Sequence, residues 1–357
     1  MLRVCVARAQ VAGQAKHMII LSIDTSCDET ACSVTDNTRV LSNIVWSQAS
    51  LHAKFGGVVP SLAQRKHKEN IDWVVEKAIK NSKYSVGFAG KIKKIDCIAV
   101  TIGPGLSIAL GVGINKAKQL AQEHNKPLIA VNHLEAHLLS PIANPKFPAL
   151  GLVISGGNTM LVKIGKIGSY KTLAQTRDDA LGEALDKAAR MLGLGYPGGA
   201  ILEKFAKEGN PNKYDLPIPM LGRESLGYFS YSGLKTSFYR LVEKEKPLNK
   251  IKIYNLAASF QNTAFNHLTR IIAGSIRTSN IKYQDLLVGG GVAANAEVRK
   301  RIRKMARDLG FKVWFPYSKK LCGDNAAMIG ICAYLNSKNR KKYVNIKSID
   351  RAPGLKW

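Results

Sequence analysis

Two stretches of the sequence share one design, an apolar strand, a polar turn and a returning strand. The first is Ile19-Ile-Leu-Ser-Ile-Asp-Thr-Ser-Cys-Asp-Glu-Thr-Ala-Cys-Ser-Val-Thr35, and the second is Leu150-Gly-Leu-Val-Ile-Ser-Gly-Gly-Asn-Thr-Met-Leu-Val-Lys-Ile164. Short apolar runs on both sides of a polar turn are typical of β-hairpins. Two such hairpins, each followed by alternating strands and helices, predict an α/β protein with two similar lobes.

The segments after each hairpin support this division. Leu62–Asn81 carries apolar residues on one helical face, and Cys97–Ile102 is a short apolar run typical of a buried strand. Two prolines interrupt the pattern at positions 145 and 148. We therefore expect a first lobe at residues 18–147, a second lobe at 148–335 and a basic tail at 336–357. Residues 1–17 are expected to follow an upstream start or to be a short organelle-targeting segment.

The charge of the chain is unusual. Among 357 residues there are 53 Lys and Arg against 25 Asp and Glu, a net charge of +28. Such a surplus attracts polyanions such as RNA, although a lysine-rich proteome would give the same total. Two basic segments, Lys300–Arg307 and Lys338–Lys347, are either RNA-phosphate contacts or solvated surface.

Other classes of protein are disfavoured by composition. No apolar run reaches the roughly 18 residues that a membrane span needs, so no membrane partner is expected. None of the six cysteines forms a C-x-x-C pair, which indicates reduced thiols in a cytosol-like compartment.

Four turns that follow strands are rich in Gly, Ser, Thr or acidic residues. Turns of this kind expose backbone N–H groups, which bind phosphate. None matches the P-loop or the dinucleotide-binding pattern. The sequence therefore predicts a nucleotide fold in which phosphates lie between the two hairpins and the adenosine lies near a later glycine turn. The four turns are Asp24–Thr30, Gly103–Gly105, Ser155–Thr159 and Gly289–Asn295.

His133 and His137 are spaced i and i+4, so on a helix they share a face. This is the spacing of a two-histidine metal site. Glu135 lies between them on the opposite side of the helix, which disfavours a zinc-protease arrangement. Asp324, at a helix start, is the candidate third ligand, and two His with one carboxylate suit iron or zinc. The alternative is structural, with His133 capping the helix and His137 packing inside the protein.

Collinear motifs from Met18 to Tyr334 resemble the tRNA adenosine threonylcarbamoyltransferase family, once labelled glycoproteases, in its bacterial or mitochondrial branch. The matching stretches are Ile23–Thr30, Gly103–Leu106, Asn132–His137, Val153–Thr159, Gly182–Lys187, Tyr196–Gly199, Tyr228–Thr236, Gly290–Asn295 and Gly323–Asn325. The resemblance implies the actin/sugar-kinase/Hsp70-like (ASKHA) fold with duplicated βββαβα lobes. It also implies transfer of a threonylcarbamoyl group from threonylcarbamoyl-AMP to the N6 amine of the adenosine 3′ of the anticodon. The tRNAs would be those that read codons beginning with A.

The resemblance carries functional roles over to residues of this chain. It implies one divalent metal, Fe²⁺ or alternatively Zn²⁺, on His133, His137 and Asp324. It also implies that ATP or ADP can occupy the site of the adenylate. One departure is Asn158, where the bacterial motif usually has His, which puts any role for that histidine in doubt. The residues implied to bind the adenylate are Val153, Ile154, Ser155, Gly156, Gly157, Asp186, Gly199 and Asn295.

Several interpretations stay open at this level. Asp28 and Glu29 are candidate catalytic acids or bases, with a polar turn as the alternative; Asn295 is expected to contact adenosine or ribose in preference to capping a helix. The implied partners are tRNA, a paralogous inactive companion and a small ATPase, or a homodimer if the chain is of mitochondrial type. The expected compartment is the cytoplasm, with the mitochondrion as the alternative. A small-molecule kinase or an ATP-dependent scaffold on the same fold is the competing function, and a metalloprotease is disfavoured by the histidine spacing.

Overall fold

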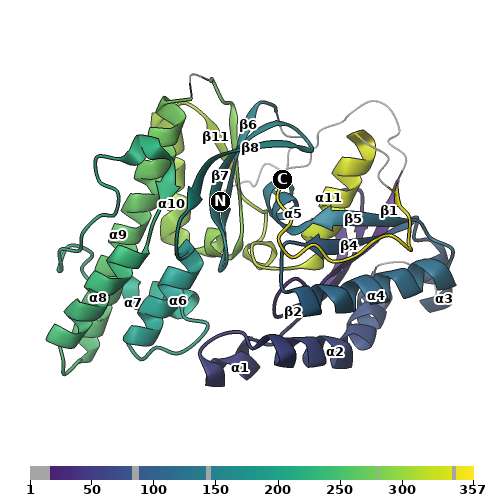
Figure 1. Ribbon diagram of the computed structural model, residues 1–357, viewed down its shortest axis with the longest axis horizontal. Coiled ribbons are helices and arrows are strands. Elements are labelled where there is room, and N and C mark those ends of the chain that lie inside the picture. The colour runs from purple at the N-terminus through teal and green to yellow at the C-terminus, as the bar shows by residue number, and fades with distance from the viewer. Residues whose placement is uncertain (1–16, 83–87, 142–145, 280, 340–342) are drawn as a thin grey trace, which may run out of the picture.

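The computed structural model describes residues 17–82, 88–141, 146–279, 281–339 and 343–357. Residues 1–16, which include most of the expected N-terminal extension, and part of the basic segment Lys338–Lys347 lie outside these residues. The described chain forms two lobes side by side, each built on a mixed sheet of six strands (Figure 1). None of the described helices is both long and apolar enough to cross a membrane.

The first lobe begins with three antiparallel strands that continue the first hairpin. Strand β1 is buried along its whole length because helices cover both faces of its sheet. Helix α2 begins at Pro60, whose fixed φ suits the first helical position. The elements are β1 (Ile19–Asp24), β2 (Glu29–Asp36), β3 (Arg39–Ser47), α1 (Ala49–His52), the 3₁₀ turn η1 (Ala53–Phe55), α2 (Pro60–Asn81), α3 (Phe88–Lys93), β4 (Cys97–Gly103), α4 (Ser107–Glu123), β5 (Leu128–Asn132) and α5 (His133–Leu139).

The second lobe repeats this plan with additional helices. Its largest apolar cluster packs the sheet against the long helix α9. Its elements are β6 (Ala149–Ile154), β7 (Thr159–Lys166), β8 (Ser169–Thr176), α6 (Leu181–Met191), α7 (Gly199–Lys207), η2 (Glu224–Leu226), β9 (Tyr228–Phe229), α8 (Ser232–Lys244), α9 (Lys250–Arg277), β10 (Asp285–Gly289), η3 (Gly291–Ala294), α10 (Ala296–Asp308), β11 (Lys312–Trp314) and η4 (Lys319–Leu321). The chain then continues into α11 (Ala326–Asn339) and β12 (Tyr343–Val344), which lie on the first sheet.

The duplication expected from the two hairpins is confirmed by the strand order. The first sheet runs β12-β5-β4-β1-β2-β3 and the second runs β11-β10-β6-β7-β8-β9. Without the added edge strands β12 and β9, the two orders are the same. The turns after β1 and β6 therefore occupy equivalent positions in the two lobes.

The C-terminal part of the chain departs from the expected division at residue 335. Helix α11 packs on the first sheet, where Met328 and Cys332 share an apolar cluster with Ile20. Strand β12 then pairs with β5, and the chain end lies between the lobes, where the Trp357 ring lies 5.0 Å from that of Tyr170 (Figure 1). The last segment thus belongs structurally to the first lobe, because its apolar residues fill the open face of that sheet.

Candidate functional site

Helix α5 presents the two histidines toward the space between the lobes. Its cap is Asn132, whose side chain accepts hydrogen bonds from the backbone N–H groups of Leu134 and Glu135, so His133 is the first helical residue. His137 follows one turn later on the same face. The two rings lie 4.7 Å apart, close to perpendicular. Asn132 therefore caps the helix, and neither imidazole is needed for this role.

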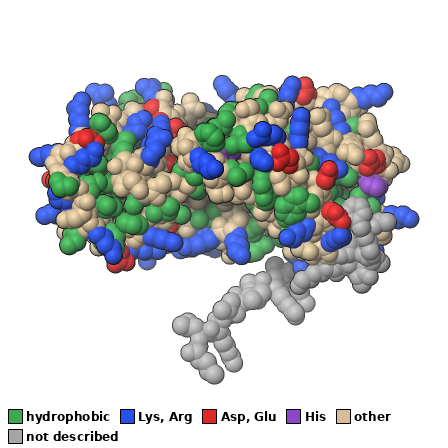
Figure 2. Space-filling model, turned by 90° about the horizontal axis from the view of Figure 1, so that it is seen from below, with side chains coloured by type: hydrophobic (Ala, Val, Ile, Leu, Met, Phe, Trp, Pro, Cys, Tyr) green, Lys and Arg blue, Asp and Glu red, His purple; other side chains and the backbone are tan. Residues whose placement is uncertain are grey.

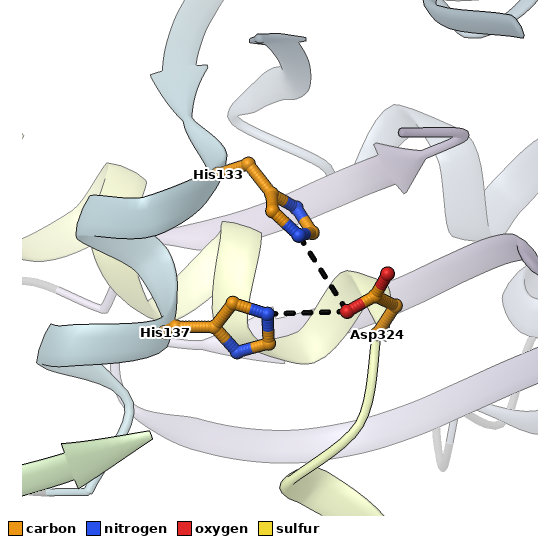
Figure 3. A group of neighbouring side chains, drawn as sticks. All are labelled: His133, His137 and Asp324. Carbon is orange, nitrogen blue, oxygen red and sulfur yellow. Dashed lines mark hydrogen bonds and ion pairs between the residues drawn. The ribbon is translucent and has the colours of Figure 1, made fainter. Parts of the chain in front are cut away.

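Asp324 meets both histidines from the loop before α11. Its Oδ1 atom lies 3.1 Å from His137 Nε2 and 3.5 Å from His133 Nε2 (Figure 3). One ligand atom from each residue falls within 4.8 Å of the others, so the three donors converge on one point. Two imidazole nitrogens and a carboxylate oxygen form a donor set that suits a transition metal. The fold therefore brings Asp324 next to both histidines, a contact that the sequence only suggested.

A fourth group, Asp24, lies behind His133 and was missed as a functional candidate. Its Oδ2 atom lies 3.5 Å from His133 Nδ1, and its side chain is buried at the end of β1. A carboxylate in this place fixes the orientation of an imidazole ligand. The available signal was an acidic residue at the carboxyl end of a buried strand, next to a candidate site.

The electrostatics of the cluster follow from this packing. Burial alone would lower the pKa of His133, but the carboxylates of Asp24 and Asp324 raise it to about 10. Burial and the neighbouring His133 lower the pKa of His137. The two histidines hold the pKa of Asp324 well below its usual range despite burial. In the metal-free protein the cluster therefore keeps Asp324 ionised and His137 neutral, whereas His133 is protonated and would release its proton on binding a metal.

Glu135 faces away from the cluster, as its place on the helix predicts. It accepts hydrogen bonds from Tyr170 Oη at 2.5 Å and from Asn336 Nδ2 at 3.0 Å. These contacts connect α5 to β8 and α11. Glu135 is thus a structural residue.

A cavity of about 790 Å³ opens beside the histidines, and all four turns contribute to it. Gly289 allows the strand before the last turn to approach α5, since a Cβ atom there would lie 2.1 Å from the His137 carbonyl oxygen. The face of the molecule in Figure 2 carries Lys and Arg side chains over both lobes. The lining residues used below are Asp28, Glu29, Gly105, His133, Ser155, Gly156, Gly157, Asn158, Asp186, Gly291 and Asp324.

The first turn brings acidic groups to the cavity. Asp28 is buried and Glu29 begins β2, where it accepts a hydrogen bond from Ser47 Oγ at 3.2 Å. Burial, with the charges of Asp28 and Asp324, raises the pKa of Glu29 well above its ordinary value. Helix α2 supports the turn through His67, whose ring nitrogens contact Thr30 Oγ1 at 2.8 Å and the Cys27 carbonyl at 3.0 Å.

The turn Ser155–Thr159, which follows β6, exposes its backbone to the cavity. Ser155 Oγ accepts a hydrogen bond from the Asn158 backbone N–H at 3.1 Å, which closes the turn. A Cβ atom at Gly156 or Gly157 would have no neighbour within 4 Å, so the cavity reaches this backbone directly. Val153 and Ile154 are buried in strand β6, and they help to fix the position of the turn that follows it.

Asp186 and Asn295, two further predicted site residues, differ in what their side chains contact. Asp186 lines the cavity, and its Oδ1 accepts hydrogen bonds from the backbone N–H groups of Gly198 and Gly199 at 2.9 and 2.7 Å. Burial raises the pKa of Asp186. Asn295 departs from the expectation: its Oδ1 caps α10, and its Nδ2 donates to Gln261 Oε1 at 3.0 Å. The helix start after the glycine turn needs a cap, and Asn295 supplies it.

Comparison with known proteins adds sequence relatives along most of the chain. The family model described as tRNA N6-adenosine threonylcarbamoyltransferase matches residues 39–331. A protein of that name from Thermodesulfovibrio yellowstonii is 46% identical over 324 residues, 89% of this chain and 94% of the relative. Its counterpart from Clostridioides difficile is 44% identical over 344 residues, 95% of this chain and 98% of the relative.

Solved structures show the fold alone. Component A of (R)-2-hydroxyglutaryl-CoA dehydratase from Acidaminococcus fermentans matches with a TM-score of 0.53 and 14% identity, over 90% of this chain and 99% of that one. Full-length HypF in its phosphate- and nucleotide-bound form matches with a TM-score of 0.54 and 15% identity, over 90% of this chain and 55% of that one. The duplicated sheets and the sequence relatives agree, and the chain belongs to the tRNA N6-adenosine threonylcarbamoyltransferase family.

Proposed function

We propose that this enzyme transfers the threonylcarbamoyl group from threonylcarbamoyl-AMP to the N6 amine of the adenosine 3′ of the anticodon, in tRNAs that read codons beginning with A. The observation that carries the proposal is one cavity with two different walls. One wall holds His133 and Asp324, which form a cluster with the buried His137, and the other holds the open turn Ser155–Gly157. A mixed carbamic–phosphoric anhydride needs both a group that activates its carbamoyl carbon and a place for its phosphate.

We infer that His133, His137 and Asp324 hold one divalent metal, Fe²⁺ or alternatively Zn²⁺. The fit rests on three donors that converge and on Asp24 behind His133. Such an ion would act as a Lewis acid toward the anhydride.

The open turn is suited to the phosphate of the donor. The backbone of Gly156 and Gly157 borders the cavity with no side chain in the way, and backbone N–H groups in such a turn stabilise anions and developing negative charge; the Ser155 N–H is used within the turn, where it donates to the Asn158 carbonyl oxygen at 2.8 Å. Asp186 lines the same cavity and accepts a hydrogen bond from Gly199, and we assign the nucleoside part to this side of the cavity. Because the side chain of Asn295 caps α10, Asn295 would affect this site only by fixing the position of that helix. ATP or ADP would occupy the same cavity.

The acceptor amine must lose a proton when the new C–N bond forms and the C–O bond to AMP breaks. We assign the uptake of this proton to the acidic turn, with Glu29 as the general base and Asp28 beside it. A carboxylate whose pKa is raised toward neutrality is a better proton acceptor than an ordinary one. AMP leaves with its charge held at the Ser155–Gly157 turn.

The partners of the reaction follow from the same proposal. The substrate tRNA is the polyanion that the net charge of +28 favours. A bacterial-type enzyme would also need a paralogous inactive companion and a small ATPase, whereas a mitochondrial-type enzyme would form a homodimer. The cytoplasm is the proposed compartment, with the mitochondrion as the alternative.

The test is a reconstituted transfer reaction. Purified protein is incubated with threonylcarbamoyl-AMP and unmodified tRNA, with and without the companion proteins, and digested tRNA is examined by mass spectrometry. N6-threonylcarbamoyladenosine, with metal content measured on the same samples, supports the proposal. ADP formed from ATP with no modified nucleoside under any condition would instead favour a kinase or an ATP-dependent scaffold.

A further inference from the structure

A basic cavity in the second lobe lies outside the site described above. It has a volume of about 320 Å³ and lies between the β7–β8 hairpin, η2 and the C-terminal end of α9. No acidic residue is among the described residues that line it. They are Lys163, Lys171, Leu173, Ser225, Ser275, Thr278, Ser279, Ile281 and Tyr283.

Two lysines face each other in this cavity. Lys163 on β7 and Lys171 on β8 are directly paired across antiparallel strands. Like charges in directly opposite positions destabilise a sheet. An anion between them would remove this repulsion, so the pair is better explained by a ligand than by folding.

Two buried hydroxyl groups in the same cavity have no hydrogen-bond partner. Ser275 and Tyr283 are each only 5% exposed, and their hydroxyl oxygens are unpaired within the described structure. Leaving a buried polar group unpaired costs about 1–3 kcal/mol. Each hydroxyl can donate one hydrogen bond to an oxyanion that enters the cavity.

Hydrogen-bond acceptors and the nearby carboxylate around the cavity already have partners. Carbonyl groups in the last turn of α9 accept hydrogen bonds from Thr278 Oγ1, at 3.0 Å to the Ser275 oxygen, and from Ser279 Oγ, at 2.8 Å to the Ile276 oxygen. Glu224, at the start of η2, is paired with Arg270. The remaining potential is set by the two lysines.

The basic cavity has a neighbouring cavity that also adjoins the catalytic cavity. A middle cavity of about 590 Å³ shares Pro104 and Asn158 with the catalytic cavity. It shares Leu173 with the basic cavity. Its walls include the rings of Tyr228 and Trp357, which offer stacking surfaces for a base. The neighbouring cavities thus offer an aromatic wall and a basic wall, which suit the bases and the phosphates of RNA.

We propose that Lys163, Lys171, Ser275 and Tyr283 form a phosphate subsite that holds a backbone phosphate of the tRNA substrate. The inference rests on the proposed function for the identity of the RNA, and on the cavity for the phosphate. Two cations and two neutral donors match the charge and the acceptor atoms of a phosphodiester.

The experiment compares two double variants. Lys163→Gln with Lys171→Gln removes the cations of the cavity, and Lys204→Gln with Lys213→Gln removes the same charge from elsewhere in the second lobe. Dissociation constants for tRNA are measured at several salt concentrations. Only the first pair should weaken tRNA binding by about tenfold and reduce the salt slope by about 1, the value for one phosphate. Tyr283→Phe and Ser275→Ala, which keep the packing, should each weaken binding by about threefold.

Two further measurements separate the outcomes. Titration with inorganic phosphate tests the cavity alone, and the transfer reaction tests the proposed function. Equal effects of the two lysine pairs would overturn the subsite, and so would loss of inorganic phosphate binding with unchanged tRNA affinity. Normal transfer with no effect of any variant would overturn the subsite and leave the function standing. A wild type that transfers nothing, but shows the cavity-specific loss of tRNA binding, would overturn the function and support the subsite.

Discussion

The turn after β1 and the turn after β6 occupy equivalent places in two sheets of the same strand order, yet their chemistry differs. The first turn carries Asp28 and Glu29 and is supported by His67 from α2. The second is a bare backbone at Gly156 and Gly157. The two turns share their geometry and differ in their side chains, and the proposed function assigns acid–base chemistry to the first and anion binding to the second.

The largest effect is expected when one of the two clustered histidines is removed. His137→Ala should reduce transfer by at least about 100-fold and lower the bound metal, because one of three converging donors is lost. His124→Ala, at the end of α4, is the matched control and should leave both unchanged. Metal analysis and single-turnover kinetics provide the readout. Full activity of His137→Ala would remove the cluster from the mechanism.

The acidic turn should give the next largest effect. Glu29→Gln should lower the transfer rate by about 10²-fold, the range for a general base, and flatten its rise with pH. Because the pKa of Glu29 is raised, the wild type gains activity as pH rises through that value. Rate–pH profiles of both proteins test this, and an unchanged profile in the variant would assign the base elsewhere.

Stability should change in the opposite sense at the same residue. A carboxyl group with a raised pKa in the folded state contributes stability at low pH and loses it as pH rises through the folded pKa. Glu29→Gln should therefore melt above the wild type at about pH 8 and close to it at about pH 4. Thermal unfolding across this range is the measurement. A difference independent of pH would show that burial of the charge is not the cause.

Two glycine variants test whether the turn Ser155–Thr159 is open to the cavity. Gly157→Ala should raise KM for the donor by about tenfold, or 1.4 kcal/mol, without changing Tm, because its methyl group points into the cavity. Gly182→Ala should lower both donor affinity and Tm, since its Cβ would lie 2.6 Å from the Ser155 carbonyl oxygen. Equal Tm losses in the two variants would show that the turn is packed and not open.

The smallest effect is expected at Asp24. In the metal-free protein, Asp24→Asn should lower the pKa of His133 from about 10, because one of two carboxylates beside the ring loses its charge. The raised pKa stabilises the fold below the ordinary pKa of histidine and is lost as pH rises toward 10. NMR titration of the His133 ring measures the shift. An unchanged titration would leave Asp324 as the dominant partner.

Much of the site was predictable because local patterns encode it. The period of the hairpins, the glycine turns and the i, i+4 histidines depend only on nearby residues. The positions of β1, β6 and α5 follow from these patterns. The function of Asn295 was not predictable, because the same side chain suits a ligand or a helix cap, and only its contacts with α10 and Gln261 decide.

Local sequence patterns were sufficient to predict the duplicated lobes, the polar turns at strand ends and the candidate donors His133 and His137. Which distant groups meet these donors depends on the folded packing. Asp24 and Asp324 are 300 residues apart, and they face the same histidine because α11 returns to pack on the first sheet. Side chains that converge from separate elements share no period or spacing along the chain. Their meeting is therefore a property of the folded packing.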